Sequence, residues 1–204
     1  MIEVLGNKGI KKIVSNYLHD KIISCETDKV KNWKFLAKTE AKFNLSSMAI
    51  KKEVLSSWTD VISKINLAVD NFFFYVALKE RGCIMIDSDV LTKYRISDKK
   101  DYVKNEDELL YFKQYVALKY YEDFSLFKNI FENEFFSESV KEGLLFWFLE
   151  YKTLSKEIRI PNSFQLKNFL DIILKNKVLL LLFLASLLPF KIRKYFIYKY
   201  LGIK

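Results

Sequence analysis

The scarcity of glycine and proline constrains this chain most, because its 204 residues include only five glycines and two prolines. Both residues mark turns and loops, and both are unfavourable inside helices. A chain with so few of them is poorly suited to a loop-rich Rossmann domain or to an all-β fold. Half of the residues are hydrophobic, so the chain can bury a sizeable core. We therefore expect an α+β fold that is mostly helical.

The order of segments predicts three parts. Short strands are expected at 22–25, at 83–86 and from residue 90. Helices are expected to start near Lys51, within 61–81, and near 105–121, 123–135, 138–153 and 164–175. Gly82 is a natural stop for the helix before it. The chain then divides into a strand-containing unit at 1–100, a helical region at 101–176 and a tail at 177–204.

The net charge of +9 is concentrated in the tail. Seven basic residues and no acidic residue lie within 172–204. A nucleic-acid-binding domain usually carries its basic residues on one face of the fold. We therefore expect no nucleic-acid partner.

The tail contains an uncharged run of 13 residues, 178–190. As a helix it spans about 20 Å, short of the roughly 30 Å hydrocarbon core of a bilayer. An apolar run followed by basic residues and tyrosines suits a helix that lies at a membrane surface. We expect peripheral attachment to the cytoplasmic face of the cell membrane, and a chain ending at Lys175 that stays folded but does not bind. The alternative is a helix buried in the protein's own core, or a subunit contact.

The few cysteines and histidines limit the kinds of active site and metal site that the chain can form. Cys25 and Cys83 are the only cysteines and show no metal-binding or redox spacing. A disulfide is an alternative, but two reduced cysteines in a cytosolic protein are the simpler expectation. His19 is the only histidine, which argues against a catalytic triad and a histidine-rich metal site. No apolar segment typical of a signal peptide stands near residue 1.

Three segments follow one another in a definite order. Residues 44–50 form a small polar segment that leads into a basic helix start, Asp70 and Asn71 open an aromatic run, and residues 91–97 contain a Tyr-Arg pair. This order resembles the second half of the catalytic domain of family 2 glycosyltransferases, inverting enzymes that use nucleotide-diphosphosugars. The resemblance covers roughly residues 40–100.

The resemblance implies the acceptor half of such an enzyme. In that family a nucleotide-binding half, ending in an Asp-x-Asp metal motif, precedes these segments. We therefore expect a partial glycosyltransferase A-type unit that is inactive alone. Its partners would be the membrane surface and a separately encoded donor-binding half. The chain alone would bind no cofactor, and Mg²⁺ or Mn²⁺ would bind only together with a donor half.

Asp70 is the catalytic residue that the resemblance implies. An inverting transfer needs a general base that takes the proton from the acceptor hydroxyl. The family usually has two acids at this place, whereas here Val69 precedes Asp70. The alternative is an aspartate on a helix surface, or the N-cap of a helix at 71–78.

Other site residues also follow from the resemblance. Asn44, Ser46 and Ser47 would line the acceptor side, although an ordinary turn with N-capping serines has the same composition. Arg95 would neutralise the charge that builds on the leaving diphosphate. The alternative for Arg95 is a surface arginine at the end of a strand.

Asp87 and Asp89 have the spacing of an Asp-x-Asp metal motif. They follow a buried-strand run, and two carboxylates after a strand can hold a hard cation. In the family, however, the acceptor segment comes after the metal motif, and here it comes before. We expect a turn between two strands, with a metal site at Asp87 and Asp89 as the alternative.

Two functions are consistent with these patterns. The first is a glycosyltransferase-like protein, related to enzymes that transfer a sugar from a nucleotide-diphosphosugar to a lipid-linked or polysaccharide acceptor. The second is a non-enzymatic, membrane-associated helical protein or partner subunit. The aromatic runs 72–75 and 146–148 are expected to be core packing in either case, and Trp33 and Trp58 are weak candidates for stacking on a sugar.

Overall fold

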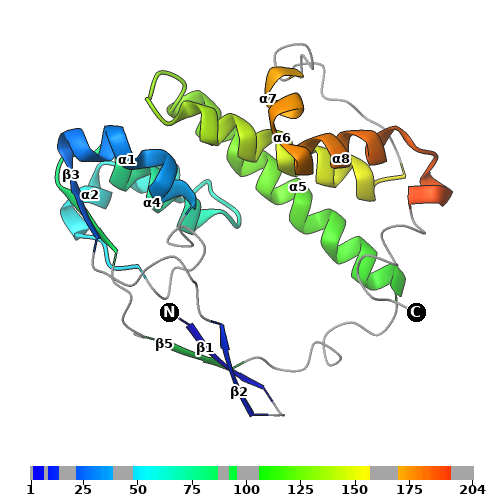
Figure 1. Ribbon diagram of the computed structural model, residues 1–204, viewed down its shortest axis with the longest axis horizontal. Coiled ribbons are helices and arrows are strands. Elements are labelled where there is room, and N and C mark those ends of the chain that lie inside the picture. Colours follow the sequence, from blue (N-terminus) through cyan, green and yellow to red (C-terminus); the bar gives the residue numbers. More distant parts are fainter. Residues whose placement is uncertain are drawn as a thin grey trace. The chain divides into compact units, whose positions relative to one another are not determined.

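The computed structural model describes residues 2–6, 9–13, 22–38, 48–86, 92–95, 106–156 and 170–193. The chain divides into two compact units. The N-terminal unit comprises Met1–Tyr102 with Asn133–Phe136, and the C-terminal unit comprises Val103–Glu132 with Ser137–Lys204. The described residues are mostly helical, which confirms this part of the predicted fold class (Figure 1).

The strands of the N-terminal unit form two small sheets. Strands β1 (Ile2–Gly6) and β2 (Gly9–Ile13) form an antiparallel hairpin, and β5 (Thr92–Arg95) pairs with β1 in parallel. Strand β3 (Ile22–Cys25) pairs with β4 (Cys83–Ile86) in antiparallel orientation. The strands predicted at 22–25 and 83–86 are confirmed, whereas β1 and β2 were not predicted.

A disulfide links the second sheet. Cys25 and Cys83 lie opposite each other in the register of β3 and β4, with Cα atoms 4.1 Å apart and the sulfurs bonded. The expectation of two reduced cysteines is therefore wrong. Strand pairing brings together residues that are 58 positions apart, which spacing in the sequence does not reveal. By limiting the freedom of the unfolded chain, closing such a loop stabilises the fold by about 4 kcal/mol in the chain-entropy picture.

Helices cover this second sheet. Helix α1 (Glu26–Lys38) packs on β3 and β4, and α4 (Val69–Lys79) contacts β4. Helix α2 (Lys52–Ser56) also contacts α4, and α3 (Thr59–Ile62) follows it in the chain. The predicted helix start near Lys51 is confirmed. Gly82, just after α4, has a φ of +113°, a conformation that favours glycine, so its predicted role as a helix stop is confirmed as well.

The aromatic run of α4 forms the core of the N-terminal unit. Phe72, Phe74 and Tyr75 are at most 3% exposed. Tyr75 stacks on Phe136 with ring centroids 5.5 Å apart and planes 8° from parallel. The prediction that residues 72–75 serve core packing is confirmed for these three, and Phe73 is half-buried. Since these rings are buried, none of the three is available as a platform for a sugar.

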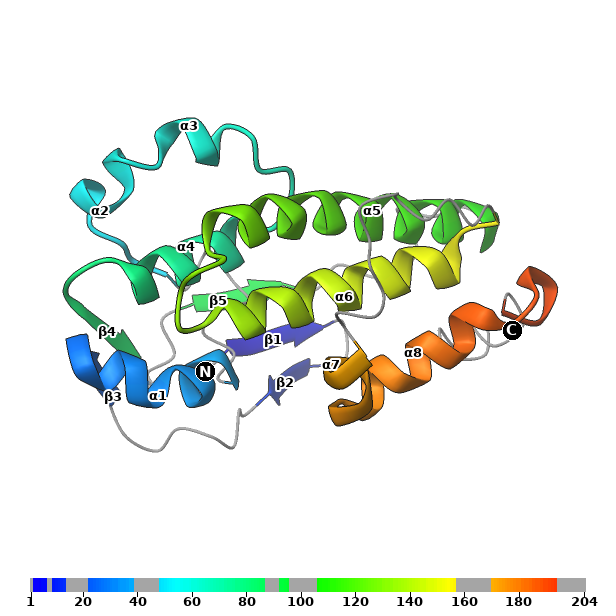
Figure 2. The same ribbon diagram turned by 90° about the horizontal axis from the view of Figure 1, so that it is seen from above.

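The C-terminal unit is built on a helical hairpin. Helices α5 (Glu106–Ile130) and α6 (Ser137–Leu154) run side by side, α8 (Lys177–Leu187) packs on α6, and α7 (Leu170–Lys175) packs against α8 (Figure 2). The predicted break between helices at 121 and 123 is wrong. No glycine or proline stands there, and α5 continues for 25 residues, or about 37 Å.

A glycine allows α5 and α6 to approach closely. A Cβ atom added at Gly143 of α6 would overlap the ring of Phe124 on α5. Phe124, Phe127, Leu145 and Leu149 of these two helices are each at most 3% exposed and belong to the core. The residue at position 143 therefore has to be small for the two helices to pack in this way.

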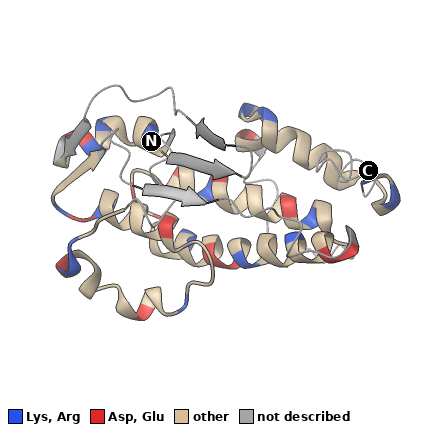
Figure 3. Cartoon of the chain, turned by 90° about the horizontal axis from the view of Figure 1, so that it is seen from below, with Lys and Arg blue, Asp and Glu red and all other residues tan. Residues whose placement is uncertain are grey.

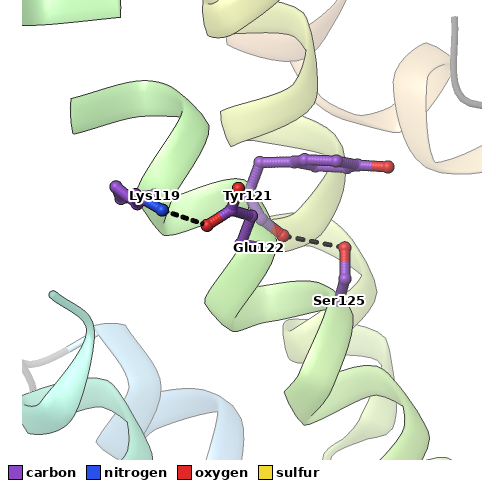
Figure 4. Close-up of polar contacts among 4 residues, drawn as sticks. All are labelled: Lys119, Tyr121, Glu122 and Ser125. Atoms are coloured by element: carbon purple, nitrogen blue, oxygen red, sulfur yellow. Dashed lines mark hydrogen bonds and ion pairs between the residues drawn. The ribbon is translucent and has the colours of Figure 1, made fainter. Parts of the chain in front are cut away.

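Two polar contacts within α5 join residues three or four positions apart. Lys119 Nζ lies 2.7 Å from Glu122 Oε2, and this hydrogen bond raises the pKa of Lys119 (Figure 4). Ser125 Oγ donates to the carbonyl of Tyr121 at 2.8 Å, and burial raises the pKa of the Tyr121 hydroxyl. Exposed ion pairs of this kind contribute little to stability. Both contacts lie within α5, and neither joins this helix to another element.

Candidate functional site

Asp70 lies in the first turn of α4. The N-cap of this helix is Ala68, so Asp70 is an intrahelical residue and the alternative of an N-cap at Asp70 is wrong. Its Oδ1 accepts hydrogen bonds from the backbone N–H of Asn71 at 2.8 Å and from the side-chain amide of Asn71 at 3.0 Å. The carboxylate is half-buried. A negative charge in the first turn is also favoured by the helix dipole.

This arrangement fixes the orientation of the Asp70 carboxylate. Asn71 is 8% exposed, so its amide is held in the core beside Asp70. The two hydrogen bonds from Asn71 both go to Oδ1. A general base needs one lone pair within reach of a hydroxyl group. Neither hydrogen bond from Asn71 goes to Oδ2, so Asn71 does not occupy that oxygen.

Most of the other predicted site residues lie outside the described part of the chain. This holds for Asn44, Ser46 and Ser47, and also for Asp87 and Asp89. Arg95 is the last residue of β5, which is paired in parallel with β1. Within the described ranges, no group of three His, Cys, Asp or Glu side chains could hold a metal ion.

A cluster that the sequence did not indicate reaches the C-terminal end of α4. Trp58 Nε1 donates to Glu80 Oε1 at 3.0 Å, and the Trp58 ring meets Phe72 edge-on at 5.7 Å. Lys79 Nζ lies 5.5 Å from the Trp58 ring centroid and 2.9 Å from Glu134 Oε1. Trp58 therefore packs against its own unit through its ring and its N–H.

A buried lysine caps the same end of α4. Lys29 of α1 is 3% exposed, and its ammonium group donates to the carbonyls of Ala77, at 3.1 Å, and of Glu80. These carbonyls have no partners within the helix, and a cation is favoured at a helix C-terminus. Lys29 thus ties α1 to α4. It positions the helix that carries Asp70, at a distance from the acid itself.

The predicted tail is partly integrated into the C-terminal unit. Leu179 of α8 is 1% exposed, and Phe190 packs against a cluster of Leu110, Ala117 and Leu154. Among the residues that the structure describes, no helix is long and apolar enough to cross a membrane.

Arg193 does not have the role expected for a basic residue of the tail, which was contact with the membrane surface. It is 2% exposed, and its Nη1 donates to the carbonyls of Lys152 and, at 3.4 Å, Thr153, at the end of α6. Burial lowers the pKa of its guanidinium, which nevertheless stays charged near neutral pH. Arg193 therefore caps α6 and does not reach a lipid head group. Its burial, with that of Leu179, argues against the expectation that a chain ending at Lys175 stays folded.

Comparisons of this chain with protein-family models, with curated proteins and with solved structures gave no match. The glycosyltransferase resemblance therefore depends on the residues and their order.

Proposed function

We propose that this chain is a glycosyltransferase-like protein that supplies the acceptor side of sugar transfer from a nucleotide-diphosphosugar to a lipid-linked or polysaccharide acceptor. The donor would be bound by a separate half, and the reaction would take place at a membrane surface. The proposal rests on the position of Asp70, which is an acid in the first turn of α4. Strand β5 (Thr92–Arg95) comes later in the chain, in the order that the resemblance implies.

The local geometry of Asp70 supports the role of a general base. Asn71 donates two hydrogen bonds to one carboxylate oxygen. The buried aromatic residues of α4 anchor the helix in the core of its unit. In the proposed reaction the other oxygen takes the proton of the acceptor hydroxyl as that hydroxyl attacks the anomeric carbon, while the nucleoside diphosphate leaves. Arg95, with Asn44, Ser46 and Ser47, would then contact the diphosphate and the acceptor.

The second candidate is a non-enzymatic, membrane-associated helical protein or partner subunit. It is favoured by the apolar side chains that α8 exposes, among them Leu181 at 67%. Both candidates share the membrane surface as a partner. They differ in whether Asp70 takes part in a reaction.

The chain alone should not bind nucleotide-diphosphosugars. In the proposal the donor and its divalent metal are held by the other half, so calorimetric titration with uridine or guanosine diphosphosugars plus Mg²⁺ or Mn²⁺ should give no binding heat. Binding in the micromolar range would contradict the proposal that only the other half binds the donor. A loss of such binding in the double variant Asp87→Asn/Asp89→Asn would then assign the metal to those two residues.

A further inference from the structure

Helix α8 consists mostly of apolar residues, yet only one side of it is buried. Leu179 and Ser186 are 1% and 0% exposed. Five other side chains, four on α8 and one at its C-cap, are between 36% and 67% exposed, and we call them the outer face of α8: Val178, Leu181, Leu184, Leu187 and the C-cap Leu188. At 3.6 residues per turn, the outer face lies on the side of the helix opposite Leu179 and Ser186. Folding of the C-terminal unit thus leaves a stripe of leucines exposed.

Exposed apolar side chains also flank α8 on both sides in the sequence. Leu174 of α7 is 69% exposed, and Ile192, in the turn after Pro189, is 45% exposed. A single exposed leucine on a protein surface needs no explanation, but a contiguous apolar patch usually marks an interaction site. The question is which partner would cover it.

Charge identifies the partner. Lys175 and Lys177 are exposed before the outer face, and Lys191 is exposed after it. Helix α8 contains no acidic residue (Figure 3). None follows Asp171 in the sequence. A surface that is apolar in the middle and cationic at both ends matches a bilayer with anionic head groups, since such a bilayer offers acyl chains below a layer of phosphates.

We propose that the outer face of α8 docks onto the surface of an anionic phospholipid membrane, with the helix axis in the plane of the membrane. The leucines enter the boundary between head groups and acyl chains, while Lys175, Lys177 and Lys191 contact lipid phosphates. The 11 residues of α8 span about 16 Å, a length suited to lying on a bilayer. Arg193 takes no part because it is buried. The inference does not depend on the transferase proposal.

Vesicle co-sedimentation of the full chain tests the proposal. We expect binding to vesicles of phosphatidylcholine with phosphatidylglycerol, much weaker binding to phosphatidylcholine alone, and a loss of binding as ionic strength rises. The double variant Lys175→Gln/Lys177→Gln should bind anionic vesicles about 25-fold more weakly, because each cation near a negative surface contributes about 1 kcal/mol, or roughly fivefold.

The apolar part is tested by Leu181→Ser/Leu184→Ser, which should weaken vesicle binding at least about tenfold. Phe112→Ser is a matched control, since Phe112 is 55% exposed on α5 of the same unit; it should bind like the unchanged chain. Circular dichroism should show all these variants folded.

Three results would overturn the proposal. The first is a Leu181→Ser/Leu184→Ser variant that is folded and binds anionic vesicles as the unchanged chain does. The second is binding that is the same for neutral and anionic vesicles. The third is a chain that ignores vesicles but forms a dimer that these two substitutions dissociate, because the outer face would then be a contact between copies of this chain.

Discussion

Replacing Asp70 with asparagine should lower the rate of sugar transfer about 10²- to 10⁴-fold when the chain is joined at its N-terminus to the donor-binding half of a family 2 glycosyltransferase. Asparagine lacks the charge that lets a carboxylate accept the acceptor's proton. It keeps the size of the side chain and an oxygen that can still accept the hydrogen bonds from Asn71. The effect should therefore appear in turnover, measured as release of nucleoside diphosphate, with the thermal unfolding midpoint nearly unchanged.

Asp60→Asn is the matched control for Asp70→Asn. Asp60 lies in the first turn of α3 in the same unit, and its side chain is exposed. Its substitution should leave the transfer rate unchanged. If Asp70→Asn keeps a near-normal rate in an active joined chain, Asp70 is an ordinary helix residue and the three segments have been aligned wrongly.

Replacing Leu179 with alanine should lower the free energy of unfolding of the full chain by about 2–5 kcal/mol. Leu179 is 1% exposed in the packing of α8 on α6, so the smaller side chain leaves a cavity. Urea unfolding followed by circular dichroism measures the change. The effect is large because a typical domain has a total stability of about 5–15 kcal/mol.

Leu181→Ala, two positions along the same helix, is the control for Leu179→Ala. Leu181 is 67% exposed, so its substitution should change the free energy of unfolding by no more than about 0.5 kcal/mol. Equal effects of the two substitutions would show that α8 does not pack on α6 through Leu179. The pair also complements the vesicle experiment, in which Leu181 matters for binding.

The parts of the fold that could be predicted depend on local signals. The length of the helices follows from the near absence of glycine and proline, and the end of α4 follows from Gly82, whose φ of +113° few other residues adopt. The strands β3 and β4 stand out as short apolar runs. The aromatic run of α4 indicates a core position because bulky rings are rarely exposed in succession.

The parts that could not be predicted depend on pairing between distant residues. Helix α1 reads as a charged segment with weak periodicity, although Lys29 is buried because it caps α4. Arg193 looks like a solvated tail cation, although it caps α6, about 40 positions earlier. The disulfide likewise depends on the register of β3 and β4. In each case the tertiary fold determines which residue is the partner, so the partner cannot be predicted from spacing along the chain.

The same distinction applies to the candidate site. The place of Asp70 at the start of a helix could be predicted, because an acid before an aromatic run is a local pattern, whereas its role as a base follows only from the resemblance. Its orientation by Asn71 and the support of α4 by Lys29 only become visible in the structure. The division of α8 into a buried face and an exposed one also lies beyond the sequence pattern, since both faces consist of leucine and similar residues.

The most direct test of the proposed function is whether this chain completes a donor-binding half. The measurement is the transfer of labelled sugar from a nucleotide-diphosphosugar to a membrane extract by a family 2 donor half alone, by this chain alone, and by the two joined. We predict transfer only by the joined chain. A joined chain that is folded and binds the nucleotide but transfers no sugar to any acceptor in the extract would contradict the proposal and favour the non-enzymatic role.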